Sequence, residues 1–207
     1  MAVATHQRER GRRLPRDERV EQLLDVAQEV FAQQGYDGAS IEQIARAAGI
    51  SRPVVYEHFG SKEGIYLACL RRGRAELDAA LVGATHGVDD LEQRLAAGVE
   101  ACFAFIEADP SRWAVLFNGV AVHGTVAAEA TRLRMATVAT IADMIHAARP
   151  RTPRRQVEAF ANALSGAGEQ LERWWRLNPD IPRAEIAGYL HSFAWEGLSQ
   201  FGRKASS

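Results

Sequence analysis

The chain of 207 residues contains only two cysteines, and they lie far apart, at positions 69 and 102. Isolated cysteines on apolar helical faces provide neither a disulfide framework nor a metal-binding pair, so we expect Cys69 and Cys102 to be reduced core residues. No apolar run approaches the roughly 18 residues of a membrane span, and the N-terminus lacks the apolar segment of a signal peptide. We therefore expect a soluble, cytoplasmic protein with no membrane partner.

The sequence also lacks the residue patterns of catalysis. None of its six histidines is paired with another histidine, a cysteine or an acid at a zinc-binding spacing. There is no nucleophile elbow, no glycine-rich phosphate loop and no redox pair of cysteines. We expect that the protein is not an enzyme and that it holds no cofactor and no metal.

An overall excess of basic residues is absent as well. Lysine and arginine number 25 against 26 aspartates and glutamates, which gives a formal net charge of −1. A basic coat for nucleic acid is therefore excluded, and any such site must be local. Residues 1–16 are locally basic, with five arginines against Glu9. They contain nothing to pack, so we expect a disordered basic arm in the free protein.

What the sequence does contain is apolar residues at helical spacing along most of its length. No segment shows sustained alternation with a period of two, and the seven prolines fall in expected loops or first turns, as an all-α protein requires. We predict a small helical domain over 17–60 and a larger one over 61–207. The first helix, over 17–34, carries outward acidic residues that we expect to be simply solvated, among them Glu21, Asp25 and Glu29.

Residues 39–62 predict two short helices joined by a tight turn. Ser40 is a good N-cap and Gln43 completes a capping box, while Gly49 can end the first helix with a positive φ. Ser51 caps the second helix, and Pro53 lies in its first turn, where a missing N–H is tolerated. Such a pair is a helix-turn-helix unit, whose second helix enters the DNA major groove. An ordinary helical hairpin fits the periodicity equally well.

Residues at fixed spacing extend beyond these two helices: Gly35-Tyr36, Ser40-Ile41, Ile44-Ala45, Ala48-Gly49-Ile50-Ser51, Tyr56, His58-Phe59 and Ser61-Lys62. Together, from about residue 19 to about residue 70, they resemble the tetracycline-repressor (TetR) family of bacterial transcription regulators. The resemblance implies a shared DNA-binding domain, a divergent ligand-binding body and pairing of two copies through a four-helix bundle. Ala39 replaces a frequent threonine, which removes a hydroxyl contact to phosphate. Pro53-Val54 replaces a frequent glycine-threonine pair, which shifts the expected base reading toward apolar contact.

Side-chain chemistry suggests how double-stranded DNA would be contacted. The Arg52 fork matches the two acceptors of guanine, and Pro53 or Val54 can meet a thymine methyl. Tyr56, Lys62 and their neighbours are expected to hold phosphates, and the arginine arm can follow phosphates or enter the minor groove. The complete expected set is Ser40, Ser51, Arg52, Pro53, Val54, Tyr56, His58, Lys62, Arg12 and Arg13.

The middle of the chain holds the candidates for an effector pocket. His123 and His146 lie among apolar helical neighbours. The commoner explanation for each is a core histidine whose hydrogen bonds are made within the protein. The alternative is a polar group that orients a ligand in an apolar cavity. The candidate walls are Phe103, Trp113, Phe117, Met135 and Met144, which are also residue types of any helical core. Such walls would suit a small hydrophobic effector.

The last two helices, predicted over 154–177 and 183–201, are candidates for self-association. Their tryptophans are costly to leave exposed, and the small residues at 165–168 allow another helix to approach closely. Monomer core is the alternative explanation. Because a helix-turn-helix normally reads a two-fold operator as a dimer, we expect a homodimer interface that contains Phe160, Leu164, Ala167, Leu171, Trp174, Leu190 and Phe193.

These observations predict a ligand-responsive, DNA-binding transcriptional regulator. We expect a repressor that binds a palindromic operator as a homodimer and is released by a hydrophobic effector. Two alternatives remain open from the sequence. One is a helical DNA-binding regulator without a small-molecule effector, and the other is a helical adaptor whose hairpin binds protein.

Overall fold

The computed structural model describes residues 15–117 and 124–199, and these residues form nine α-helices and no strand. The predicted all-α class is confirmed. The helices are α1 (Arg16–Gly38), α2 (Ile41–Ala47), α3 (Arg52–Phe59), α4 (Lys62–Thr85), α5 (Leu91–Ala108), α6 (Pro110–Phe117), α7 (Gly124–Ala148), α8 (Arg154–Trp175) and α9 (Arg183–Ser199). None of these helices is both long and apolar enough to cross a membrane. Arg12, Arg13 and His123 lie outside the described residues.

The three N-terminal helices share a small core. Leu23, Leu24 and Ala27 of α1 belong to one buried core with Ile44 of α2 and Val55 of α3, and each of these side chains is at most 5% exposed. Gly35 ends the regular part of α1 with φ of +69°, a conformation that glycine adopts without a Cβ penalty. The expected first helix is therefore longer by a kinked final turn.

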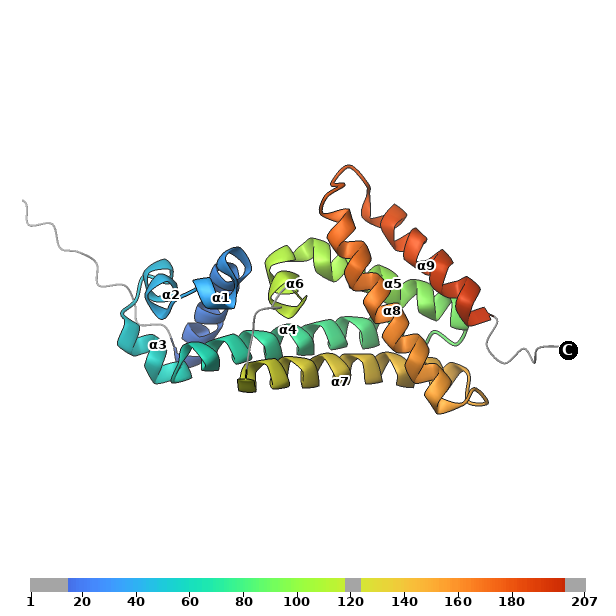
Figure 1. Ribbon diagram of the computed structural model, residues 1–207, viewed down its shortest axis with the longest axis horizontal. Helices are drawn as coiled ribbons and strands as arrows, with labels where there is room; N and C mark the ends of the chain where they lie inside the picture. Colours follow the sequence, from blue (N-terminus) through green and yellow to red (C-terminus); the bar gives the residue numbers. More distant parts are fainter. Residues whose placement is uncertain (1–14, 118–123, 200–207) are drawn as a thin grey trace, which may run out of the picture.

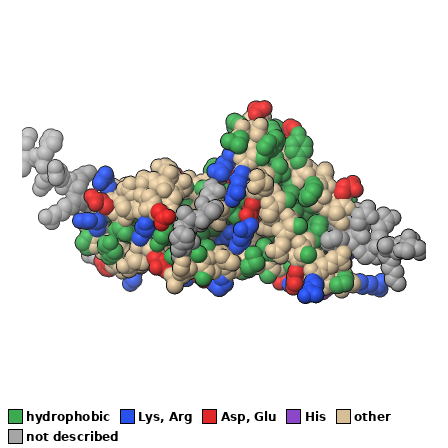
Figure 2. Space-filling model, viewed as in Figure 1, with side chains coloured by type: hydrophobic (Ala, Val, Ile, Leu, Met, Phe, Trp, Pro, Cys, Tyr) green, Lys and Arg blue, Asp and Glu red, His purple; other side chains and the backbone are tan. Residues whose placement is uncertain are grey.

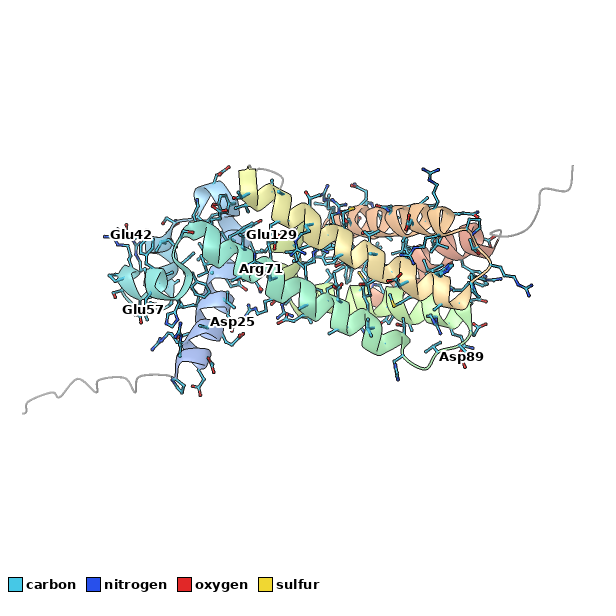
Figure 3. The ribbon with its side chains drawn as sticks, turned by 90° about the horizontal axis from the view of Figure 1, so that it is seen from below. Asp25, Glu42, Glu57, Arg71, Asp89 and Glu129 are labelled. Carbon is cyan, nitrogen blue, oxygen red and sulfur yellow. The ribbon has the colours of Figure 1, made fainter. Side chains whose placement is uncertain are left out.

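The body is built on two long helices, α4 and α7, which lie side by side and run in the same direction (Figure 1). Figure 3 shows Arg71 of α4 and Glu129 of α7 facing one another across this pair, with a guanidinium–carboxylate distance of 3.1 Å. Hydrogen bonds from Arg132, and then from Arg71, lower the pKa of Glu129 to about 2. Helix α5 packs against α4, α8 packs against α7, and α9 packs against α5 and α8. Helix α6 lies between α1 and the body (Figure 1).

The outer acidic residues of α1 are not simply solvated, contrary to the sequence-based expectation. Arg72 of α4 donates to Asp25 at 2.7 Å and to Glu21 at 3.0 Å. The Ser111 hydroxyl of α6 donates to Glu29 at 3.0 Å. These partners lie 47 to 82 residues away along the chain, so helical periodicity contains no information about them. They attach α1 to the body.

Candidate nucleic-acid interface and internal cavity

The turn between α2 and α3 forms as local sequence signals predict. The Ser40 hydroxyl accepts from the Gln43 backbone N–H at 3.2 Å, and the Gln43 side chain accepts from the Ser40 backbone N–H at 2.8 Å. This reciprocal pair is the predicted capping box. Gly49 has φ of +67° and turns the chain toward α3. Ser51 stands at the N-cap of α3, yet its hydroxyl makes no capping hydrogen bond, so it can reach an outside acceptor.

The outward face of α3 presents several of the predicted DNA contacts. Arg52, Pro53 and Tyr56 are exposed, Val54 and His58 are half-buried, and Val55 faces the core. Arg52 contacts Glu42 of α2 at 3.8 Å, and both side chains are about three-fifths exposed. Such an exposed ion pair contributes little to the stability of the fold. The Arg52 guanidinium can therefore leave Glu42 and contact a base edge at a small cost in free energy.

Acidic residues also lie at this end of the molecule. Figure 3 shows Glu42 on α2 and Glu57 on α3 at the tip of the small domain. A carboxylate repels phosphates, but it can accept from the exocyclic amine of cytosine. Glu57 was not among the sequence-based candidates, because an exposed acid on a helix is usually no more than solvated.

Lys62 has a different role from the predicted phosphate contact. Its ammonium donates to the carbonyls of Tyr36 at 2.8 Å, Ala39 at 3.1 Å and Asp37 at 3.4 Å, and it lies 4.5 Å from the centre of the Tyr36 ring. A lysine has three donors, and all three are used here. Lys62 therefore satisfies the carbonyls left over where α1 ends, 23 to 26 residues earlier in the chain.

The body contains an internal cavity with a volume of about 100 Å³. A single water molecule requires roughly 10–15 Å³ of cavity volume. The cavity is therefore large enough for an apolar group bigger than a water molecule. Its wall on α4 runs from Arg74 through Leu77 and Leu81 to Thr85, a length of roughly 16 Å at the rise of an α-helix. The other walls come from α5, α6, α7, α8 and α9, with Val99, Phe117, Ile141, Gly168 and Leu190 as representatives.

Three of the seven predicted pocket residues line this cavity: Trp113, Phe117 and Met144. Phe103 is fully buried, but it packs against Trp175 with ring centroids 5.6 Å apart and does not line the cavity. Met135 is 46% exposed on the outside of α7. His146 is half-buried outside the cavity, with its Nδ1 atom lacking a hydrogen-bond partner among the described residues.

The cavity residues that sequence reasoning missed are mostly aliphatic, but Arg74 could have been found. It is in phase with Leu70, Leu77 and Leu81 on α4, so a charged residue interrupts an apolar stripe. Cys102 was expected in the core, and it lines the same cavity. Burial raises the pKa of its thiol to about 12, so the thiol is protonated and unreactive at neutral pH.

Helices α8 and α9 carry an exposed apolar surface (Figure 2). Leu177, Phe193, Tyr189 and Trp174 are its most exposed large side chains, from 81% for Leu177 to 42% for Trp174. Among the residues predicted to mediate self-association, Phe160, Leu164, Ala167 and Leu171 are half-buried. Leu190 is only 4% exposed and lines the cavity, as Leu164 does. Leu190 therefore serves the interior of the monomer.

Within residues 15–117 and 124–199, no group of three or more His, Cys, Asp or Glu side chains could hold a metal ion. The described residues present an exposed helix-turn-helix face and a largely apolar cavity, and α4 runs from the first to the second. A three-helix DNA-binding domain on a helical body with an internal cavity defines a class, the two-domain helical transcription regulators.

Comparison with known proteins narrows this class to one family. Residues 23–69 match the family model described as bacterial regulatory proteins, tetR family, and residues 91–197 match the tetracyclin repressor-like C-terminal domain. The chain belongs to the TetR family and is a DNA-binding transcriptional regulator.

Three relatives illustrate the extent of the similarity. The transcriptional activator FasR of Mycolicibacterium smegmatis is 39% identical over 194 residues, which cover 92% of this chain and 87% of FasR. The transcriptional repressor AcnR of Corynebacterium glutamicum is 37% identical over 57 residues, 28% of this chain and 30% of AcnR. A TetR-like regulator from Rhodococcus sp. RHA1 has a solved structure that is 28% identical, with a TM-score of 0.75 over 90% of this chain and 99% of that one. All three are named as transcriptional regulators.

Proposed function

We propose that this regulator binds a palindromic operator as a homodimer in the cytoplasm and releases it when a small hydrophobic effector enters the body. The observation that carries the proposal is the path of α4. This helix begins against α3, at the Ser61 N-cap, and its distal half forms one wall of the cavity. A ligand that favours a different tilt of α4 therefore changes the position of the DNA-binding helix.

Helix α6 supports the same coupling by a second route. Trp113 and Phe117 on α6 line the cavity. At the other end of the helix, Asp109 accepts from the buried Gln28 of α1 at 2.8 Å, next to the Ser111–Glu29 contact. A shift of α6 caused by a ligand would thus move α1 as well. The effect on DNA binding can be no larger than the difference in ligand affinity between the two arrangements.

In the proposed dimer the two α3 helices lie one helical turn of DNA apart, roughly 34 Å. Arg52 is the proposed base contact, with Pro53, Val54, Tyr56, His58 and the serines Ser40 and Ser51 around it. The Ser40 hydroxyl already takes part in the capping box, so its contact with DNA would use a remaining lone pair. Arg12 and Arg13 complete the proposed interface.

Replacing Arg52 with alanine is expected to weaken operator binding by a factor of roughly 5 to 150, equivalent to the loss of about 1–3 kcal/mol from a guanine contact. The preference at that base position should be lost as well. Fluorescence anisotropy with the operator and with single-base variants measures both effects.

The matched control is Arg46→Ala, because Arg46 is equally charged, is exposed on α2 and contacts the same Glu42. Removal of Arg46 should leave the base preference at that position unchanged. If Arg52→Ala leaves affinity and base preference unchanged, Arg52 is not the base contact. Absence of specific binding by the wild-type protein to any DNA fragment would favour the adaptor alternative.

Release by an effector predicts a reciprocal linkage. A ligand that weakens operator binding by some factor must bind the operator complex more weakly by the same factor, and typical coupling factors are roughly 5 to 150. Calorimetric titration of a ligand into the free protein and into the operator complex measures the two affinities. Equal affinities would favour the alternative of a regulator without an effector.

The relatives include both a repressor and an activator of transcription. AcnR, a repressor, matches this chain over 57 residues, and its name agrees with the repression predicted from the sequence. FasR, an activator, matches over most of the chain. Because the sign depends on where the operator lies relative to the promoter, a reporter assay with the native promoter decides it. Release by the effector applies equally to both signs.

A further inference from the structure

The cavity wall contains a buried cation without a counterion. Arg74 is 4% exposed, and its guanidinium donates one long hydrogen bond, 3.4 Å, to the Leu116 carbonyl. Among residues 15–117 and 124–199, no carboxylate oxygen lies within 4.0 Å of its nitrogens. A buried charge without such a partner is costly, which makes Arg74 unlike the surrounding leucines and valines.

Two carboxylates, Glu169 and Asp78, act electrostatically on Arg74, but neither forms an ion pair with it. Glu169, which also lines the cavity, accepts from Arg134 at 2.5 Å and from the Ser165 hydroxyl at 3.2 Å. Asp78 lies one turn further along α4, and its buried Oδ1 atom has no hydrogen-bond partner among the described residues. Both carboxylates act to raise the pKa of Arg74, yet burial outweighs them and lowers it to about 10. The guanidinium is thus still charged at neutral pH, and it forms no direct ion pair with the described residues.

Aromatic stacking holds this guanidinium in one orientation. Its central carbon lies 4.2 Å from the centre of the Phe117 ring, and Trp113 stacks on the same ring with centroids 3.9 Å apart. Stacking covers the face of the guanidinium and leaves its N–H edges available for a planar acceptor. A carboxylate is such an acceptor, since it can take two parallel N–H bonds.

A second polar group without a partner lies close by. The Thr137 hydroxyl on α7 is buried, has no hydrogen-bond partner among the described residues and lines the same cavity. The contacts Arg71–Glu129 and Thr85–Met144 pair α4 with α7 at offsets of 58 and 59 residues. This register brings Thr137 level with Asp78, about one helical turn, roughly 6 Å, beyond Arg74. Both groups are therefore within reach of one ligand.

We propose that the effector is an amphipathic carboxylate whose head group binds Arg74, with Thr137 donating a further hydrogen bond. Its apolar body then lies along Leu77 and Leu81 toward Thr85. The inference rests on the proposed function and deepens it from a hydrophobic effector to an anionic one.

A second arginine at the cavity provides a natural comparison. Arg94 lines both the cavity and an adjoining surface depression, together with Thr85 and Met144. It donates to the carbonyls of Val88 at 2.6 Å and Met144 at 3.3 Å, and it is only half-buried. Two carbonyls thus accept from the half-exposed Arg94, whereas the buried Arg74 has a single acceptor at 3.4 Å.

The test compares three probes with the same alkyl chain: dodecanoate, dodecanol and dodecyltrimethylammonium, each below its micelle concentration. Calorimetry with the full-length protein should find dodecanoate at least tenfold tighter than the alcohol, with the cation weakest. In Arg74→Met the affinity for dodecanoate should fall at least tenfold, to that of the alcohol, and Arg74→Lys should restore part of it. Arg94→Met is the matched control and should retain the preference for the acid.

The outcomes distinguish the proposal of a carboxylate effector from the more general proposal of a hydrophobic effector. Equal binding of acid and alcohol by the wild type, or an unchanged preference in Arg74→Met, overturns the carboxylate proposal and leaves the hydrophobic effector intact. Failure of all three probes to bind overturns both.

Two further measurements exclude a purely structural role for Arg74. Without ligand, Arg74→Met should melt at or above the wild-type temperature, because it removes an unpaired buried charge; a large drop would mean that Arg74 supports the fold. Thr137→Val preserves shape and charge, and it should weaken dodecanoate several-fold while leaving dodecanol unchanged. An unchanged affinity for dodecanoate in Thr137→Val would contradict the assigned head-group position.

Discussion

Gly64→Ala is expected to destabilise the protein by about 1–3 kcal/mol, the usual cost of forcing an extra methyl group into a packed site. Gly64 lies in the first turn of α4, where its N–H donates to the Ser61 hydroxyl at 2.9 Å. A Cβ at this position would lie 2.0 Å from the Phe59 carbonyl oxygen and 3.1 Å from the Phe59 carbonyl carbon. Because these atoms are backbone, the end of α3 must move away from α4 to admit the methyl group.

The same substitution should impair DNA binding beyond its effect on stability. Displacing the end of α3 changes the angle at which the helix-turn-helix meets the major groove, so we expect operator affinity to fall at least tenfold, about 1.4 kcal/mol. Thermal unfolding and an operator titration, the latter performed well below the melting temperature, measure the two effects separately.

Gly83→Ala is the matched control, since Gly83 lies in the same helix and an added Cβ there has no neighbour within 4 Å. Alanine is the better helix former by roughly 0.5–1 kcal/mol, so Gly83→Ala should be as stable as the wild type or slightly more stable. If both variants behaved alike, α3 and α4 would not approach as closely as the structure describes.

Phe193→Asp is expected to convert the proposed dimer into a monomer and to lower operator affinity by a factor of roughly 10²–10⁴. Phe193 is 69% exposed on α9 and is one of the large exposed apolar side chains of the α8–α9 surface. A carboxylate buried in a helix-to-helix interface has no counterion and is strongly unfavourable. Two linked DNA-binding domains gain a factor of roughly 10²–10⁴ from avidity, and a monomer loses it.

Light scattering coupled to size exclusion gives the mass, and an operator titration gives the affinity. Met135→Asp is a suitable control, because Met135 is also a large exposed apolar residue, 46% exposed, but lies on α7. It should leave both mass and affinity unchanged. A Phe193→Asp protein that remains dimeric at micromolar concentration would show that the α8–α9 surface is not the interface.

Features that depend on neighbours within a few residues were predictable from the sequence. The Ser40 capping box and the turn at Gly49 are of this kind, because their hydrogen bonds join residues at most four or five positions apart. The start of α4 at Ser61 follows the same rule. The helix starts and the turn of the DNA-binding domain therefore agree with the predictions made from the sequence.

Features that depend on long-range packing were not predictable in the same way. Lys62 was interpreted as a phosphate contact, since periodicity cannot show that the end of α1 supplies carbonyls to its amine. On α9, Leu190 and Phe193 are three residues apart and share a helical stripe, yet one lines the cavity and the other faces outward. Whether a residue on such a stripe faces the cavity or the solvent depends on where the other helices of the chain pack against it.

The attachment of α1 to the body has a consequence for the design of sensors. Hybrid regulators are made by joining the DNA-binding domain of one protein to the body of another. A junction at residue 60 here would separate Asp25 and Gln28 from their partners Arg72 and Asp109. The hybrid would keep both folds but lose the contacts between them. The body of such a hybrid should therefore carry residues at positions 72 and 109 that match the transplanted DNA-binding domain. Without these contacts, we expect that a ligand bound in the body will not change the affinity of the transplanted domain for its operator.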